Sequence, residues 1–186
     1  VKTFLCPSDG GNKRLPRGSA HYSPDGTAGQ VEAVKTCYDF IAQADGVGRY
    51  NWWRNTTTGT RYIFGENSDT QLTHITDGTS NTLLMGEQTL ELFNGVTSSW
   101  AYAGWVSVGI DPVGAWNVTF PAQGLNIWNY NNNPSPLNRV RGRRASWYNA
   151  ASLHTGGVNF VFADGSVKFI QESTSVPTLT FLSRMA

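Results

Sequence analysis

The residues with the clearest chemical potential are a histidine and an aspartate near the end of the chain. His154 and Asp164 could form a His–carboxylate pair, which serves acid–base catalysis or metal binding in other proteins. Asp164 is followed by Gly165, however, and Asp-Gly between two apolar runs is typical of a hairpin turn. His154 precedes Gly156 and Gly157, where a ring nitrogen can hold the incoming loop. We therefore favour a structural role for these five residues over a catalytic one.

The sequence shows no motif that would supply a catalytic nucleophile beside His154 and Asp164. Ser152 lies close to His154 in the sequence but is not part of a Gly-x-Ser-x-Gly turn. Acyl transfer needs a nucleophile, a base and a group that orients the base. Because the sequence does not show this combination, we do not expect an enzyme, and a hydrolase is the least favoured function.

A second group of polar residues has the oxygen-rich character of a calcium loop. Asp77, Asn81 and Glu87 supply side-chain oxygens, and Gly78 permits a sharp bend. The spacing does not follow the EF-hand pattern, and calcium takes about six to eight oxygens, more than this segment shows. A turn explains the same residues more simply. We therefore expect no metal or other cofactor, with calcium at these three side chains as the alternative.

Aromatic residues in one polar segment are candidates for surface contacts. The segment 126–138 is rich in Asn and Pro, offers little to bury and is expected to form a long surface loop. Trp128 and Tyr130 lie in it, and exposed Trp and Tyr side chains are typical of binding surfaces. These two residues could contact other subunits or stack on the sugar rings of surface glycans.

A β-hairpin near the C-terminus is the clearest structural element. The runs Val158–Ala163 and Ser166–Ile170 flank Asp164 and Gly165, and this Asp-Gly connection favours a type I′ turn in which both residues have positive φ. Alternate residues of a strand face the same side. The residues that we expect on the core face of this hairpin are Val158, Phe160, Phe162, Val167 and Phe169.

The other predicted elements are short. Apolar residues recur at spacings of three and four over Ala28–Ala44, which predicts a helix. Thr36–Ile41 is rich in β-branched and aromatic residues, so a strand there is the alternative. Elsewhere β-prone runs bounded by Gly, Asn, Asp and Ser predict strands at Arg61–Phe64, Thr82–Met85 and Trp100–Val108.

Length and composition limit the class of protein. The chain has 186 residues, of which 39% are hydrophobic and 15% are charged. A chain of this length can bury a sizeable core. Because the sequence shows no linker and no internal repeat, we expect a single domain over residues 1–186. Its 14 basic and 13 acidic side chains leave a net charge of +1, which argues against nucleic-acid binding. No segment has the run of about 18 apolar residues that spans a bilayer.

Three segments together resemble a known family. They are the opening segment Phe4–Asp9 (FLCPSD), the central segment Ile75–Glu87 (ITDGTSNTLLMGE), and His154 with nine residues before Asp164-Gly165. In this order they resemble the DUF1559 family of prepilin-like proteins, which carry an H-X9-DG motif and are abundant in planctomycetes.

The resemblance implies an extracytoplasmic protein related to type IV pilins and type II secretion pseudopilins. Its fold would be α+β, a pilin-like head dominated by an antiparallel β-sheet with few short helices and long loops. Such proteins begin with a prepilin cleavage site and a long apolar helix that joins the subunits of a filament. The match starts at Phe4–Asp9, so we expect this chain to correspond to the head, with membrane contact only through a helix outside it.

The same resemblance bears on the two cysteines. An even number of cysteines in an extracytoplasmic protein favours pairing, so Cys6 and Cys37 are expected to form a disulfide. Two buried free thiols are the alternative, since free cysteine is often buried.

The expected function is that of a non-enzymatic structural or assembly protein at the cell surface or outside the cell. Its partners would be copies of itself or other pilin-like subunits. A carbohydrate- or surface-binding module that uses aromatic residues on loops is the first alternative. Nucleic acid is not expected as a partner.

Overall fold

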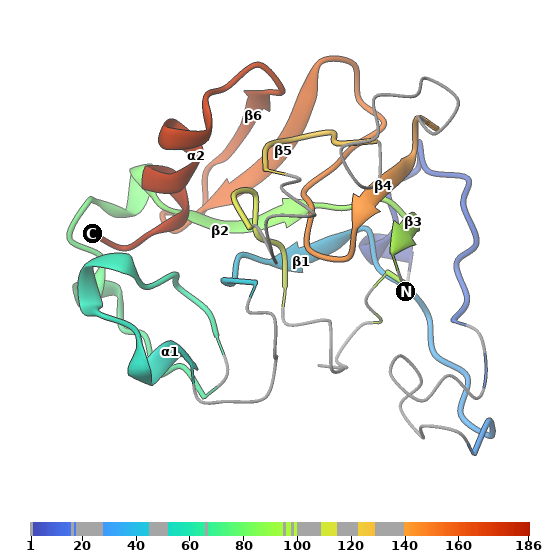
Figure 1. Cartoon of the computed structure of the whole chain (residues 1–186), viewed down its shortest axis with the longest axis horizontal. Coiled ribbons are helices and arrows are strands. Elements are labelled where there is room, and N and C mark those ends of the chain that lie inside the picture. Colours follow the sequence, from blue (N-terminus) through green and yellow to red (C-terminus); the bar gives the residue numbers. More distant parts are fainter. Residues whose placement is uncertain are drawn as a thin grey trace.

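The computed structural model describes residues 2–15, 17, 28–44, 52–65, 67–94, 96–97, 99, 109–114, 123–128 and 140–186. These residues form an antiparallel four-stranded sheet, a small parallel pair of strands, two short helices and several 3-10 turns (Figure 1). This architecture confirms the expected α+β fold dominated by an antiparallel sheet.

The four-stranded sheet has the strand order β1-β2-β5-β6, and each neighbouring pair is antiparallel. Its strands are β1 (Tyr38–Phe40), β2 (Leu83–Glu87), β5 (Gly157–Phe162) and β6 (Val167–Gln171). The strand predicted at Thr82–Met85 is therefore confirmed as β2, displaced slightly toward the C-terminus.

The remaining elements lie around this sheet. β3 (Glu91–Asn94) and β4 (Arg143–Ser146) form a parallel pair. The helices are α1 (Trp52–Asn55) and α2 (Val176–Ser183). The 3-10 turns are η1 (Lys2–Phe4), η2 (Thr58–Thr60), η3 (Leu72–His74) and η4 (Thr79–Asn81).

One face of the sheet packs against the main core. Val158, Phe160 and Phe162 alternate along β5 and are all buried there, as expected for side chains that share one side of a strand. Ile170 of β6 and Leu179 of α2 belong to the same cluster. The helix α2 therefore lies over this face, which we call the core face (Figure 1).

The helix α2 begins where its sequence provides a cap. The hydroxyl of Ser175 accepts a hydrogen bond from the backbone N–H of Thr178 at 3.3 Å. Pro177 lies in the first turn, where a missing N–H costs nothing because the first N–H groups of a helix have no partner within it. This cap places the fully buried Leu179 one turn into the helix.

The hairpin of β5 and β6 forms as predicted, but its turn differs. Gly165 donates its backbone N–H to the carbonyl oxygen of Phe162 at 2.9 Å and has a φ of 84°, whereas Asp164 does not have positive φ. The predicted type I′ turn is therefore wrong. The connection is Ala163–Gly165, one residue longer than predicted, in which a tight turn is followed by a left-handed glycine.

The longer connection changes which side of β6 meets the core. Val167 and Phe169 lie on the face away from the core and are exposed, whereas Ile170 pairs with Val158 and is buried. The core positions predicted for Val167 and Phe169 are therefore wrong. The physical reason is that a change of one residue in register moves every side chain of a strand to the opposite face.

The helix predicted over Ala28–Ala44 is also wrong, and the alternative strand is present as β1. Cys37 donates its backbone N–H to the carbonyl oxygen of Phe4 at 2.8 Å, and β1 pairs with β2. Backbone partners from distant parts of the chain thus outweigh the helical spacing of the apolar residues.

The other predicted segments are described only in part. Arg61–Phe64 makes a single isolated bridge, between Phe64 and Ala42, and is not a strand. The strand predicted at Trp100–Val108 lies outside the described residues, and so does most of the predicted loop 126–138.

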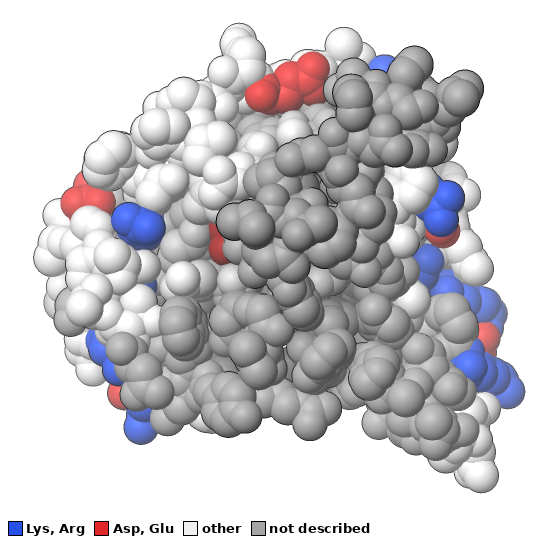
Figure 2. Space-filling view, viewed as in Figure 1, with Lys and Arg blue, Asp and Glu red and all other residues white. Residues whose placement is uncertain are grey.

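On the face shown in Figure 2, the charged side chains of the described residues do not form one broad field. Basic and acidic side chains lie there in small groups, most of them near the margin. Arg144 is fully buried and donates to the carbonyl oxygens of Trp147 and Asn149, both at 2.8 Å. Its charge therefore serves the packing of β4 and not a surface contact.

Candidate functional site

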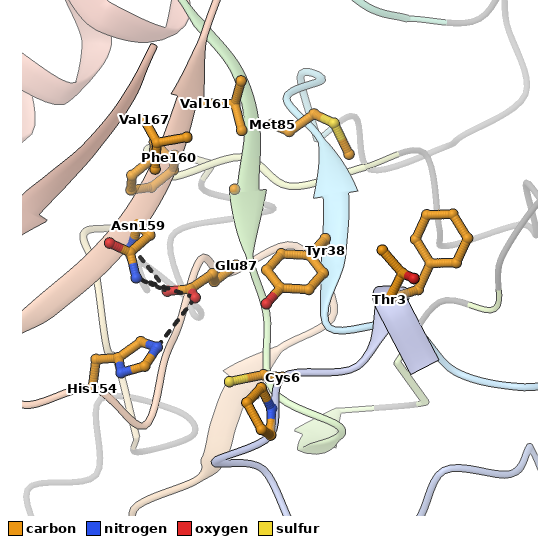
Figure 3. Close-up of a pocket in the computed structure, with 13 residues that line it drawn as sticks. Thr3, Cys6, Tyr38, Met85, Glu87, His154, Asn159, Phe160, Val161 and Val167 are labelled. Carbon is orange, nitrogen blue, oxygen red and sulfur yellow. Dashed lines mark hydrogen bonds and ion pairs between the residues drawn. The ribbon is translucent and has the colours of Figure 1, made fainter. Parts of the chain in front are cut away.

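Three side chains from distant parts of the chain meet beside the four-stranded sheet. Cys6 follows η1, Glu87 is the last residue of β2, and His154 lies in the loop that leads into β5. Each side chain offers one atom that could bind a metal: a thiol sulfur, an imidazole nitrogen or a carboxylate oxygen. These three atoms lie within 4.8 Å of one another (Figure 3). We call these three residues the Cys-Glu-His cluster.

Glu87 is the buried centre of the cluster, with 4% of its surface exposed. Its Oε2 atom accepts a hydrogen bond from the backbone N–H of Asn159 at 2.9 Å. The side-chain amide of Asn159 lies 3.3 Å from Oε1 and 3.2 Å from Oε2. Because β2 and β5 are neighbours in the sheet, strand pairing itself brings this donor to the carboxylate and fixes its orientation.

His154 approaches the same carboxylate from the loop before β5. Its Nε2 atom is 3.4 Å from Oε1 of Glu87, and 40% of its side chain is exposed. Its backbone N–H donates to the hydroxyl of Ser152 at 3.2 Å, which holds the loop in place. The imidazole is therefore directed at Glu87 and remains accessible to solvent.

Both cysteines are free thiols, so the predicted disulfide between Cys6 and Cys37 is not formed in this structure. They lie in one buried cluster with Leu90. The sulfur of Cys6 points toward the cluster partners Glu87 and His154 (Figure 3). Burial raises the pKa of the Cys37 thiol to about 11, which keeps that thiol protonated at neutral pH.

An apolar groove opens beside the Cys-Glu-His cluster. Its volume is about 590 Å³, and it lies between the N-terminal segment and the face of the sheet that points away from the core. We call this face the outer face. The apolar and hydroxyl side chains along the groove are Thr3, Phe4 and Pro7 from the N-terminal segment and Tyr38, Met85, Phe160, Val161 and Val167 from the sheet.

Strand register arranges the outer face in two rows. The apolar row crosses all four strands and consists of Phe40, Met85, Val161 and Val167. The second row contains Tyr38, Glu87, Asn159 and Phe169. Phe40, Val167 and Phe169 are 47%, 66% and 48% exposed, so much of this apolar surface is uncovered.

His154 and Asp164, the pair that carries the H-X9-DG motif, do not meet. They lie beyond opposite ends of β5, and such a strand spans about 20 Å at about 3.3 Å per residue. The Asp164 carboxylate instead accepts hydrogen bonds from the hydroxyl of Ser166 at 2.7 Å and from its backbone N–H at 2.8 Å. These bonds lower the pKa of Asp164 and tie its side chain to the hairpin turn.

The glycines of the motif have different geometric roles. Gly156 and Gly165 both have a φ of 84°, in the left-handed region, and nothing would contact a Cβ atom at either position. Gly157 has no room for a side chain, because a Cβ atom would lie 2.2 Å from the carbonyl oxygen of Ile170. The first two are required by backbone conformation, and Gly157 is required by its close approach to β6.

The candidate calcium ligands are not brought together. Asp77 and Asn81 belong to one turn before β2, where the Asn81 side chain donates to the backbone carbonyl oxygen of Asp77 at 3.0 Å. Glu87 lies at the opposite end of β2, in the Cys-Glu-His cluster. The turn that we favoured from the sequence accounts for Asp77 and Asn81.

The predicted surface aromatics are only partly accounted for. Trp128 is half-buried and lines a cavity of about 180 Å³ together with His154 and Glu172. Tyr130 lies outside the described residues.

A buried carboxylate ties separate loops together away from the cluster. Asp111 accepts hydrogen bonds from the hydroxyl of Tyr62 and the backbone N–H of Ala44, both at 2.8 Å, and from the N–H of Val113 at 3.0 Å. Burial raises the pKa of Asp111 to about 6 and also raises the pKa of Tyr62. Each oxygen of Asp111 thus has a donor, which suits a structural role.

From the sequence, Glu87 was considered as a calcium ligand and His154 as a partner of Asp164. Their proximity to Cys6 was not predicted. The signal that links them is indirect. Each of the three segments that carry the family resemblance contributes one member of the Cys-Glu-His cluster: Phe4–Asp9, Ile75–Glu87 and the segment that begins at His154.

Taken together, the antiparallel sheet, the buried cluster and the left-handed glycines describe an α+β domain built around these three segments. A family model described as "Protein of unknown function (DUF1559)" matches residues 1–176. The chain therefore belongs to the DUF1559 family. A search of curated proteins and a search of solved structures each find no match. None of the helices in the described part of the chain has the length and apolar character to cross a membrane.

Proposed function

We propose that this chain is the globular head of a non-catalytic structural subunit, of pilin or pseudopilin type, that acts outside the cytoplasm. Its partners would be copies of itself or other pilin-like subunits. The observation that supports this proposal is the apolar row on the outer face of the four-stranded sheet.

An antiparallel sheet on a protein that acts alone commonly packs one face on the core and exposes a polar face to water. In this sheet the core face is covered by Leu179 and its neighbours, yet the outer face carries the apolar row as well. A contiguous exposed apolar patch is typical of an interaction surface. Phe40 and Val167 lie at opposite ends of the apolar row, so the patch extends across the full width of the sheet.

An apolar helix is the partner that we propose for this row. The family resemblance implies subunits that join through long apolar helices, and such a helix presents a surface of matching character. Burying the exposed parts of Phe40 and Val167 in this row, and of Phe169 beside it, would then contribute to assembly through the hydrophobic effect.

The test places a charge on the row without disturbing the core. Val167→Asp, on the apolar row, and Phe169→Asp, on the row beside it, are introduced into the full-length gene in its native host. Leu72→Asp is the control at an exposed apolar residue outside the groove. Assembly is measured as the sedimentable material sheared from cells and by electron microscopy. We expect the two sheet variants to fold, as judged by circular dichroism of the isolated head, but to lose assembly, while the control assembles normally.

Normal assembly of both folded sheet variants would contradict the proposal. A loss of assembly in the Leu72→Asp control as well would also contradict it, because the effect would then not belong to the apolar row.

A further inference from the structure

We propose that Cys6, Glu87 and His154 form a binding site for one zinc ion. The inference is independent of the proposed assembly role, because it rests on the geometry of the Cys-Glu-His cluster alone.

The three ligand types are those that zinc prefers. Zinc binds thiolate sulfur, imidazole nitrogen and carboxylate oxygen, usually with tetrahedral geometry. In such a site the ligand atoms lie about 3.3 to 3.8 Å from one another, given zinc–ligand bonds of about 2.0 to 2.3 Å. Nε2 of His154 and Oε1 of Glu87 are already 3.4 Å apart, and the Cys6 sulfur is within 4.8 Å of the other ligand atoms. Only a small inward movement of Cys6 would complete the set.

The same ligands argue against calcium and magnesium. Both are hard cations that take oxygen ligands, and a thiol with an imidazole does not suit them. The chemistry of the cluster therefore selects a borderline-soft ion of the zinc class.

Glu87 is held in a fixed orientation by its neighbours, as the ligands of known metal sites are. Ligating carboxylates are usually held by hydrogen bonds from a second layer of residues. The backbone N–H of Asn159 donates to Oε2, and the Asn159 side chain lies within 3.3 Å of both oxygens. Oε1 faces His154 and is therefore directed into the cluster.

Burial supplies the energetic reason for a cation at this place. A buried carboxylate is costly unless it is paired with a positive charge or fully hydrogen-bonded. Among the described residues, the ion-pair partner of Glu87 is His154, which carries a charge only when it is protonated. A bound divalent ion would place a positive charge directly beside the buried carboxylate of Glu87.

The surroundings also provide an entry path and a fourth ligand position. Cys6 is 8% exposed and Glu87 is 4% exposed, whereas 40% of the His154 side chain is open to solvent. The adjoining groove leaves room for a water molecule or another ligand beside the ion. An ion there would link the N-terminal segment, β2 and the loop before β5.

The experiment titrates zinc into the reduced, chelator-treated chain and measures stoichiometry by calorimetry and melting temperature by circular dichroism. We expect one zinc ion per chain and a higher melting temperature with zinc, because a ligand that binds only the folded state stabilises it. Calcium at the same concentration should change neither. Cobalt in place of zinc should give a thiolate-to-cobalt charge-transfer band, which reports a thiolate ligand, and this band should be lost in Cys6→Ser and kept in Cys37→Ser.

Variants assign the ligands. Cys6→Ser and His154→Gln should each weaken zinc binding by about a hundredfold or more, since even changes beside a ligand cost about ten- to a hundredfold. The matched controls are Cys37→Ser, the other buried thiol, and His74→Gln, a histidine in η3 outside the cluster. Both controls should bind zinc as the parent chain does.

Three outcomes would overturn the proposal. The first is a folded, reduced parent chain that does not bind zinc. The second is unchanged affinity in folded Cys6→Ser or His154→Gln. The third is the formation of a Cys6–Cys37 disulfide in protein purified without reductant, even when zinc is present. The cluster would then lack its sulfur ligand. If a variant does not fold, the cobalt band of the parent chain still decides whether a thiolate is bound. None of these outcomes depends on assembly.

Discussion

Asn159 holds Glu87 through both of its amide groups. The backbone N–H of Asn159 donates to Oε2 of Glu87 at 2.9 Å, and its side-chain nitrogen lies 3.2 Å from the same oxygen. One contact follows from strand pairing and survives any substitution except proline, whereas the other depends on the side chain. This difference makes the contribution of the side chain measurable.

Replacing Asn159 should therefore destabilise the fold by an amount that depends on the new side chain and on pH. Asn159→Ala removes one donor from a buried carboxylate and should cost about 1 to 2 kcal/mol of unfolding free energy. Asn159→Asp places a second carboxyl group beside Glu87, and the repulsion between two like charges should cost more stability at pH 7.5 than at pH 4.5, where added protons weaken it. Urea denaturation at both pH values measures this. An aspartate variant whose deficit is the same at the two pH values would contradict it.

Gly157 should not tolerate even a methyl group. A Cβ atom there would lie 2.2 Å from the carbonyl oxygen of Ile170 and 2.8 Å from the ring of Phe169. Because the nearest obstacle is backbone of the paired strand β6, Gly157→Ala should cost about 3 kcal/mol. Gly59→Ala is the control, since nothing lies within 4 Å of a Cβ atom at that position. Thermal unfolding of the two variants should show a large loss only for Gly157→Ala, and equal losses would refute the steric argument.

The hairpin turn should discriminate between side chains at Gly165. Its φ of 84° is strained for a side chain, although the space around it is open. Gly165→Val should cost about 2 to 3 kcal/mol because a β-branched residue rarely adopts this conformation. Gly165→Asn should cost less, since asparagine tolerates the left-handed region. Chemical denaturation gives both values, and a valine variant as stable as the asparagine variant would show that the turn rearranges.

Asp111 should make stability depend on pH between about 4 and 7. Its pKa is raised to about 6 by burial, above the value of about 3.9 in an unfolded chain. The native state thus holds the proton more tightly, so this stabilisation is fully present below about pH 4 and is lost as pH rises through about 6. A difference of about two pKa units corresponds to about 3 kcal/mol.

The measurement for Asp111 compares the parent chain with Asp111→Asn. The asparagine variant is expected to be less stable overall, because its amide group would face another donor, such as the N–H of Ala44. Between pH 4 and pH 7.5, the unfolding free energy of the parent chain should fall by about 3 kcal/mol more than that of the variant. Parallel pH profiles for the two proteins would show that Asp111 does not carry this dependence.

Local sequence pattern was sufficient where neighbours along the chain make the structure. The β5–β6 hairpin is set by two β-prone runs around Asp164 and Gly165, and β2 by a short apolar run after a turn. The turn geometry was not predictable in the same way. Asp164 and Gly165 suit several turn types, and the choice among them decides whether Val167 or Ile170 meets the core.

Long-range contacts decided the strand β1. The apolar spacing around Tyr38 suits a helix, but the backbone of Cys37 bonds to Phe4 and β1 pairs with β2. These partners are distant in sequence, so periodicity within one segment carries no information about them.

The sequence by itself determined the family, the sheet-dominated fold and the three segments that carry most of the distinctive residues. Only the tertiary structure brought Cys6, Glu87 and His154 within 4.8 Å of one another and left an apolar row on the outer face. The physical reason is that propensity and turn chemistry act between neighbours along the chain, whereas the cluster depends on strand register and on the path of the N-terminal segment. Both are set by packing and backbone pairing between residues far apart in the sequence.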